Sequence, residues 1–511
     1  MISGANKNSY LNMKNPALLS ANTTFAICGN NYSFYKSKRM TFILGKQTQK
    51  FFLLQMFFTI TLYCSAQTVS SRMDHGVDSL VNAEIKKQKM PGVSVVVLRD
   101  GKIDHVKGYG LANIEHKVAV KPETIFQSGS VGKQFAAFAI MLLVEDGKIS
   151  LDDPLTKFFP DAPVTWNSIK VKNLLTHTAG FGEYPDNFNF RADYTEDSLY
   201  QVIKKMPLEF AAGEKSVYSN MGYVTLGLII SKVSGKFYGD FLKQRIFDPL
   251  GMTTARIISE YDIVPNRAAG YRMLDAEIKN QQWVSPSINT TADGSMYVTA
   301  LDMAKWEAGL NAAKLLKKES YDMIWSPVKL NNGSTYPYGF GWRIDSMQGK
   351  RIIEHDGTWQ GFETTIKRYP EKKLAVIVFA NLRSANTNKI ATTIMKLYQP
   401  ELVTPPLKAI KDNEPKVIAL VKDFVVKLID NKLTADLFTP EFGERFIPRS
   451  GRASAHLKSL GKFMGIELLN RKELPDASKV HHYRILFSNE PEELLITITK
   501  DNKIAAIEGR D

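Results

Sequence analysis

Ser130 and Lys133 lie three residues apart in the stretch FQSGSVGKQFAAFAIMLLVEDGKIS (126–150), where polar and glycine residues lead into an apolar run. The stretch predicts a helix that starts near Ser130, and side chains three apart share one face of a helix. A serine next to a desolvated lysine can be a nucleophile, because burial favours the neutral amine that accepts its proton. Backbone N–H groups at the helix start would also stabilise a developing oxyanion.

The Ser-x-x-Lys spacing is weak evidence by itself. The chain has the same spacing at Ser33–Lys36 and Ser459–Lys462, to which we assign no role. In the simpler interpretation, Ser128 or Ser130 only caps a helix and Lys133 is a solvated residue of its first turn. The nucleophile hypothesis therefore needs support from other parts of the chain.

A second candidate is Tyr218-Ser219-Asn220, in the segment GEKSVYSNMGYVTLG (213–227). A tyrosine hydroxyl whose pKa is lowered by nearby cations can carry a proton between nucleophile and leaving group. The Asn220 amide can both donate to and accept from a substrate amide. The simpler alternative is a buried loop tyrosine, and Tyr10-Leu11-Asn12 repeats the pattern without any assigned role.

A third candidate is His355-Asp356-Gly357, in IIEHDGTWQGF (352–362). A strand that ends in a side chain able to carry positive charge, followed by a glycine, suits close approach of a substrate to a sheet edge. The backbone N–H of Thr358 could then pair with that of Ser130 as an oxyanion hole. A structural, hydrogen-bonded histidine is the alternative.

The elements that would position these residues alternate between strands and helices. Residues 75–89 predict an amphipathic helix, and Asp100-Gly101 predicts the turn of a hairpin. A helical section follows from Ser130 to about residue 310, and another helix spans 388–398. Between them, β-rich runs predict strands at 339–345, 350–357, 361–370 and 373–382. This order favours an α+β domain with a mostly antiparallel sheet built from sequence-distant halves.

The C-terminal part predicts a second, smaller unit. Residues 401–415 are rich in proline and charge and read as a linker after a main domain of residues 67–400. Residues 416–511 begin with a helical pattern and continue with alternating runs at 481–488, 493–499 and 503–509. We expect a small α+β domain, which weakly resembles cone-shaped domains of the nuclear-transport-factor-2-like (NTF2-like) type.

Taken together, the three motifs in this order resemble the serine hydrolases of the penicillin-binding-protein and class C β-lactamase family. Three further segments, NLLTHTAGFGEY, DGSMYVTALDMAKW and YGFGWR, are similar to that family as well. The resemblance covers roughly residues 74 to 400. It implies a β-lactamase/transpeptidase-like fold, in which a sheet-containing domain lies beside an all-helical subdomain and the site lies between them.

The resemblance also implies a mechanism of acyl transfer. Ser130 would form a covalent acyl-enzyme, with Lys133 and Tyr218 as a coupled pair of which either could be the acylation base. Asn220 would orient the substrate, and His355, Gly357 and Thr358 would lie at the substrate and oxyanion side. Water would complete the hydrolysis, and the chemistry requires no cofactor and no metal.

The sequence departs from class C β-lactamases at the third motif, where those enzymes carry Lys-Thr-Gly. His355 would be only partly charged near neutral pH, and Asp356 would repel an anionic substrate unless it points away. We therefore expect cleavage of short acyl esters or D-amino-acyl peptides rather than efficient β-lactam hydrolysis. A class C-like β-lactamase is the alternative. A non-catalytic protein that recognises penicillin or peptidoglycan fragments is another.

The first 66 residues predict a leader with a secretory signal peptide. KQTQKFFLLQMFFTITLYCSAQ has two lysines, an apolar core too short to span a membrane, and small residues ending at Ala66. Translation would start at Met40, and the mature chain would be exported to the periplasm or medium. Lipid attachment at Cys64 is disfavoured by the bulky Tyr63. Both cysteines, Cys28 and Cys64, lie in this leader, so the mature chain would have no disulfide.

The charge balance argues against nucleic-acid binding. The net charge is +14, but seven of these positive charges lie within residues 1–66, which contain no acidic residue. The rest of the chain has no dense basic run, and phosphate binding requires clustered cations. The expected partner is a small ester or a peptide, such as one derived from peptidoglycan, and the sequence does not define an oligomeric state.

Overall fold

The computed structural model describes residues 73–258, 261–405 and 407–510. The predicted leader and signal peptide, residues 1–66, lie outside the described residues. Within the described part of the chain, no helix is long and apolar enough to cross a membrane.

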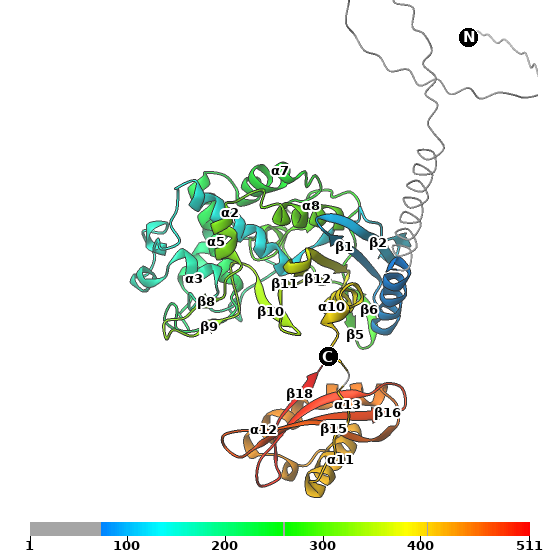
Figure 1. Cartoon of the computed structure of the whole chain (residues 1–511). Coiled ribbons are helices and arrows are strands. Elements are labelled where there is room, and N and C mark those ends of the chain that lie inside the picture. The colour runs from blue at the N-terminus through cyan, green and yellow to red at the C-terminus, as the bar shows by residue number, and fades with distance from the viewer. Residues whose placement is uncertain (1–72, 259–260, 406, 511) are drawn as a thin grey trace, which may run out of the picture. The chain divides into compact units, whose positions relative to one another are not determined.

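A seven-stranded antiparallel sheet is the framework of the region that carries the three motifs (Figure 1). The first and last parts of this region pair directly, since Val96 lies opposite Ile377. In spatial order the strands are β10 (Arg343–Met347), β11 (Lys350–Trp359), β12 (Phe362–Tyr369), β13 (Leu374–Ala380), β1 (Gly92–Arg99), β2 (Lys102–Asn113) and β3 (Val118–Ala119). The hairpin between β1 and β2 turns at Asp100 and Gly101, whose φ angles of 53° and 73° are those of a type I′ turn.

Successive side chains along a strand of the sheet pack into two different hydrophobic cores, one on each face, because side chains alternate between the faces with a repeat of two residues. Val96 and Leu98 pack with the helical section, whereas Val95 and Val97 pack with helix 73–88 and α10 (Thr387–Tyr398). Figure 1 shows α8 (Ala300–Asn311) and α10 on opposite sides of the sheet. The sheet is therefore buried on both faces, which accounts for the continuous apolar run VVVL in β1.

The helical section lies between β4 (Phe126–Gln127) and the late strands. Its helices are α2 (Lys133–Glu145), α3 (Val171–Leu175), α4 (Glu196–Lys204), α5 (Asn220–Ser234), α6 (Tyr238–Leu242), α7 (Asp248–Leu250), α8 and α9 (Lys318–Ile324). Short strands within it were not predicted: β5 (Tyr271–Leu274), β6 (Glu277–Asn280), β7 (Tyr297–Val298), β8 (Val328–Lys329) and β9 (Thr335–Tyr336). β4 pairs with β7, which brings the segment before Ser130 next to residues 293–298.

The C-terminal part has its own four-stranded antiparallel sheet in the order β15-β16-β17-β18. Its elements are α11 (Pro415–Ile429), α12 (Pro440–Phe446), α13 (Gly451–Ser459), β15 (Phe463–Glu473), β16 (Lys479–Phe487), β17 (Glu492–Ile498) and β18 (Ile504–Arg510). Val421 and Phe424 of α11 pack on Tyr483 and Ile496 of the sheet. β15 was not predicted, and the similarity to NTF2-like domains stays a prediction.

The α+β class and the mostly antiparallel sheet built from distant halves are both confirmed. The predicted helices at 75–89 and 388–398 and the four predicted late strands are present, each within a few residues of the expected bounds.

Candidate active site

Ser130 lies in a short 3₁₀ helix, Gly129–Gly132, that leads directly into α2. Lys133 is the first residue of α2, and its Nζ donates a hydrogen bond to Ser130 Oγ over 3.0 Å. The Lys133 residue is completely buried, and the Ser128 side chain makes no capping hydrogen bond. The geometry thus differs from the simple helix-cap alternative, in which Lys133 would be solvated.

The surroundings of Lys133 explain how a lysine can be buried here. Its Nζ also donates to Asn220 Oδ1 over 2.7 Å and to the backbone carbonyl of Asp293. The rings of Tyr218 and Tyr223 lie 4.9 and 5.4 Å from Nζ, within range of cation–π attraction. Three acceptors therefore satisfy its three possible N–H donors without any solvent contact.

The cap of α5 positions Tyr218 and Asn220. Ser219 is the N-cap residue, and its Oγ accepts a hydrogen bond from Gly222 N over 3.1 Å. This cap leaves Tyr218 in the extended segment before the helix and Asn220 in its first turn. Asn220 Nδ2 donates to Glu183 Oε2 over 2.9 Å, which fixes its amide with Oδ1 toward Lys133.

Gly357 on β11 allows the strand to approach the Ser130 backbone. A Cβ on Gly357 would lie 2.2 Å from Ser128 O and 2.8 Å from Ser130 N, and one on Gly129 would lie 2.6 Å from Thr358 N. Gly129 also has a φ of 51°, in the left-handed region that favours glycine. The backbone amides of Ser130 and Thr358 are thus brought together, and both residues line one cavity of about 400 Å³.

The side chain of His355 lies beside Tyr218, with the two ring centroids 6.2 Å apart. It is buried, its Nδ1–H donates to Asp356 O over 2.6 Å, and its Nε2 accepts from Tyr338 Oη over 2.9 Å. Burial, and then the charges of Lys133 and Arg343, lower the pKa of His355 to about 3. The imidazole is therefore neutral near pH 7, unlike the partly charged group expected from the sequence, and it is absent from the described lining of the Ser130 cavity.

Asp356 points away from Ser130. Its carboxylate accepts from Thr365 Oγ1 over 2.7 Å and from Asn388 Nδ2 over 3.2 Å, and it pairs with Arg343 Nη1 over 3.1 Å. The predicted repulsion of a substrate at Ser130 is thus avoided by the alternation of side chains along β11.

Four residues close to this site were not predicted: His177, Glu183, Tyr184 and Asp293. His177 Nδ1 accepts from Ser219 N over 3.1 Å, and its ring lies 4.2 Å from that of Tyr218. Burial first, and then the charges of Lys133 and His355, lower the pKa of His177 well below its usual value. Three of the four lie in NLLTHTAGFGEY and the fourth starts DGSMYVTALDMAKW, but no spacing within these segments indicated a role.

The cavity at Ser130 has aromatic and polar walls. Tyr184, Phe190 and Trp359 contribute rings. The other lining residues are Gly129, Asn220, Gln282, Asp293, Gly294, Thr358, Gln360 and Arg383. Tyr184 Oη donates to Asp293 Oδ2 over 3.0 Å, and burial raises the pKa of Tyr184 well above its usual value. In the described part of the chain no three Cys, His, Asp or Glu side chains gather as metal ligands would.

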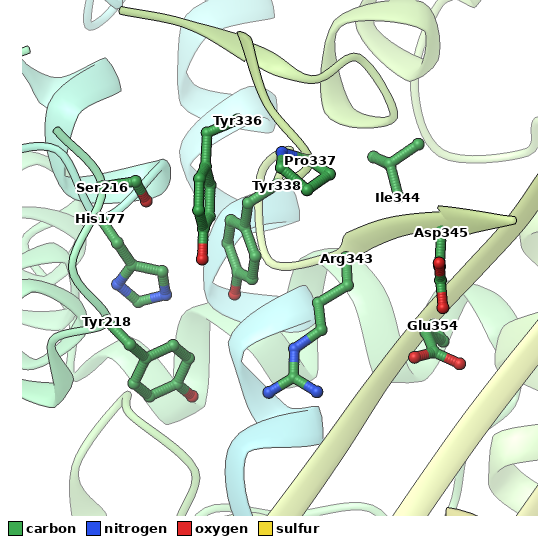
Figure 2. Close-up of a pocket in the computed structure, with 10 residues that line it drawn as sticks. All are labelled: His177, Ser216, Tyr218, Tyr336, Pro337, Tyr338, Arg343, Ile344, Asp345 and Glu354. Atoms are coloured by element: carbon green, nitrogen blue, oxygen red, sulfur yellow. The ribbon is translucent and has the colours of Figure 1, made fainter. Parts of the chain in front are cut away.

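A second cavity of about 280 Å³ lies on the Tyr218 side (Figure 2). His177, Ser216 and Tyr218 line it from the helical section, and Tyr336, Pro337 and Tyr338 from the segment before β10. Arg343, Ile344 and Asp345 of β10 and Glu354 of β11 complete its lining. Tyr218 thus lies in the wall of this cavity while its ring contacts Lys133, which bonds to Ser130.

The family profile named Beta-lactamase matches residues 73–398 of the chain, which is most of the described part. The chain belongs to the beta-lactamase family. The match includes all three motifs and ends with α10. The family predicted from those motifs is thereby confirmed.

Individual relatives agree with the beta-lactamase family. The chain is 30% identical over 306 residues to penicillin-binding protein 4* of Bacillus subtilis, covering 56% of this chain and 67% of the relative. Among solved structures, the octameric penicillin-binding protein homologue from Pyrococcus abyssi is similar with a TM-score of 0.59 and 25% identity, covering 84% of this chain and 94% of that one. D-amino acid amidase from Ochrobactrum anthropi, complexed with L-phenylalanine amide, has a TM-score of 0.57 at 22% identity, covering 65% of this chain and all of that one.

These matches confirm the β-lactamase/transpeptidase-like fold, with the additional C-terminal sheet described above. The beta-lactamase family is one of serine hydrolases, and the buried Ser130–Lys133 pair is the group of this chain that fits such chemistry.

Proposed function

We propose that the chain is an exported serine hydrolase that cleaves an ester or amide through a covalent acyl-enzyme on Ser130. The observation that carries the proposal is the 3.0 Å hydrogen bond between Lys133 Nζ and Ser130 Oγ, with Lys133 fully buried. A serine hydroxyl needs a nearby proton acceptor to become a nucleophile, and Lys133 would be that acceptor in its neutral form, with N–H bonds to Asn220 and Asp293 O and its lone pair toward Ser130 Oγ.

The proposed steps follow from the contacts. Ser130 Oγ attacks the carbonyl carbon, its proton passes to the Lys133–Tyr218 pair, and the N–H groups of Ser130 and Thr358 bind the oxyanion. Collapse of this intermediate breaks the bond to the leaving group, which takes the proton from Tyr218. Water then attacks the acyl-enzyme, returns a proton to Ser130 Oγ and releases the acid. Asn220, fixed between Lys133 and Glu183, would orient the acyl part of the substrate.

The proposed substrates are D-amino-acyl peptides or amides and short acyl esters. The similarity to a D-amino acid amidase supports the first class at the level of the fold. The aromatic wall of the Ser130 cavity supports an apolar acyl group. At the third motif, where class C enzymes have a lysine, His355 is neutral and bonded to Tyr338, which argues against tight binding of a β-lactam carboxylate.

The test is active-site labelling followed by a substrate panel, with purified residues 67–511. We expect a fluorophosphonate or fluorescent penicillin probe to label the wild type but not Ser130→Ala. Ser459→Ala is the matched control, because Ser459 stands in the same Ser-x-x-Lys spacing but its hydroxyl donates to His456 O. Equal labelling of wild type and Ser130→Ala would exclude Ser130 as the nucleophile.

The panel consists of p-nitrophenyl acetate and butyrate, D-amino-acid anilides, a D-Ala-D-Ala peptide and nitrocefin. We expect ester or D-amino-acyl amide cleavage to dominate. Fast nitrocefin turnover with little else would favour a β-lactamase, and labelling without turnover of any substrate would favour a recognition protein.

Export is a separate proposal that rests on the sequence of the leader. Expression of the full chain with N-terminal sequencing of the exported product should give a start at Gln67. A lipid-modified N-terminus at Cys64, or an uncleaved cytoplasmic product, would contradict it.

A further inference from the structure

The cavity on the Tyr218 side is lined by the residue proposed to give its proton to the leaving group. This inference rests on the proposed function, in which Tyr218 gives its proton to the leaving group. Because Tyr218 lines this cavity and Ser130 lines the other one, the bond to be cleaved would lie between them. The part of the substrate released by the first step would then extend into the 280 Å³ space next to Tyr218 (Figure 2).

Arg343 is the side chain that decides the charge of this cavity. Among the described residues that line it, Arg343 alone is permanently cationic, and its side chain is 48% exposed and so can reach a ligand. A free guanidinium here would attract a carboxylate on the leaving group.

Arg343 is already paired. Its Nη1 lies 3.1 Å from Asp356 Oδ2. The Asp356 carboxylate cannot easily turn away, because Thr365 Oγ1 and Asn388 Nδ2 both donate to it. The same strand also holds His355, whose Nδ1–H donates to the backbone carbonyl of Asp356. The ion pair is thus built into neighbouring strands β10 and β11.

The remaining charges of the cavity are acidic. Asp345 and Glu354 line it, and Glu354 is paired with the buried Lys367 of β12. A carboxylate entering the cavity would therefore meet a neutralised arginine and a nearby aspartate rather than a free cation, and like charges in a partly desolvated site repel.

We infer that this cavity accepts a neutral or cationic leaving group and discriminates against one that carries a carboxylate, and that Asp356 is the residue that sets this preference. The substrates would be amides, esters, or peptides whose released part ends in an amine. Peptides whose released residue has a free carboxylate would be poor substrates. Asp356 is not one of the described residues that line the cavity. It acts through Arg343 and is therefore a positioning residue.

The test uses two esters with the same acyl group, so that the unknown acyl preference cancels. 4-Acetoxybenzamide and 4-acetoxybenzoate differ only in whether the phenol released carries a carboxylate. We expect the wild type to prefer the benzamide, after both rates are divided by those of hydroxide-catalysed hydrolysis. The informative quantity is the ratio of kcat/KM for the two esters in each variant.

Asp356→Asn is the key variant, because asparagine keeps an oxygen for Thr365 and Asn388 while removing the charge. It should raise kcat/KM for the benzoate about tenfold, the size of one charge-assisted hydrogen bond, and change the benzamide less than twofold. The double variant Arg343→Gln/Asp356→Asn should lose this gain. Asp248→Asn removes an exposed Asp–Lys pair with Lys243 and is the matched control, for which the ratio should stay at the wild-type value.

The outcomes separate the two proposals. If the wild type prefers the benzoate, or if Asp356→Asn leaves the ratio unchanged while both esters are cleaved, the inference about Asp356 is wrong. If neither ester is cleaved and Ser130 is not labelled by a fluorophosphonate, the proposed hydrolase function fails first. Circular dichroism of each variant checks that a lost rate does not reflect unfolding.

Discussion

Replacing His355 by glutamine should weaken the pH dependence of stability in a calculable way. His355 is 1% exposed, and its two ring nitrogens are committed to Asp356 O and Tyr338 Oη. Glutamine can still accept a hydrogen bond from Tyr338 but cannot be protonated in this pH range. The substitution therefore removes a titration while leaving an acceptor in place.

The size of the effect follows from proton linkage. The pKa of His355 is lowered to about 3 in the folded chain, against about 6.5 in an unfolded one. The unfolded state therefore binds the proton first as the pH falls, so stability is present above pH 6.5 and is lost below it. Between pH 7.5 and 5 this amounts to about 2 kcal/mol, and the value hardly changes as long as the folded pKa stays below 4.

Urea denaturation followed by tryptophan fluorescence measures this difference. All six tryptophans lie between residues 166 and 359, so the signal reports the region with the site and not the C-terminal sheet. The free energy of unfolding of the wild type and of His355→Gln is measured at pH 7.5 and pH 5. We expect the pH-dependent loss to be about 2 kcal/mol smaller in the variant.

A comparison of the two pH values cancels any constant loss of stability caused by the substitution itself. His116→Gln, at an exposed position, is the control and should leave the wild-type dependence intact. If His355→Gln shows the same pH dependence as the wild type, the histidine is not buried in its neutral form, and the neutral state assigned to the third motif is refuted.

Three other substitutions test the site. Lys133→Met should lower kcat for ester hydrolysis about a thousandfold, because it removes the amine bonded to Ser130, and a loss under tenfold in stopped-flow acylation would contradict that role. Tyr218→Phe should slow amides and alkyl esters about a hundredfold but p-nitrophenyl esters much less, since a good leaving group needs no proton; equal losses in kcat on both would argue against proton donation. Gly357→Ala should lower kcat at least a hundredfold through the clash with Ser128 O, and Gly451→Ala, whose added Cβ meets nothing within 4 Å, is its control; normal turnover by Gly357→Ala would disprove the close approach of β11.

The parts of the site that could be predicted are those whose spacing is local. Ser130 and Lys133 are three residues apart, so a single helical turn brings them together wherever the helix packs. Gly357 was predicted as a position where a Cβ would block approach, and the distances to Ser128 and Ser130 agree with that expectation. The hairpin turn at Asp100-Gly101 is likewise a property of two adjacent residues.

The parts that could not be predicted depend on residues distant in sequence. Whether His355 is charged is decided first by the burial that packing imposes and then by the charges of Lys133 and Arg343, all set by residues distant from His355 in the sequence. Asp356 is turned away from the site by Thr365 and Asn388, on β12 and α10. Neither partner has a pattern that marks it as one, because any nearby hydroxyl or amide would serve.

The two neutral histidines restrict where the Ser130 proton can go. His177 and His355 both have a lowered pKa, and the charge of Lys133 is the second cause in each case after burial. His177 Nδ1 accepts a hydrogen bond from Ser219 N, and both ring nitrogens of His355 are hydrogen-bonded. Each acceptor nitrogen is therefore already occupied and is not available to take the Ser130 proton. Arg343 cannot accept a proton at all. Lys133 and Tyr218 are then the groups left to exchange it, and Lys133 Nζ lies 4.9 Å from the centroid of the Tyr218 ring. The pH dependence of acylation should therefore show no step near the usual pKa of histidine.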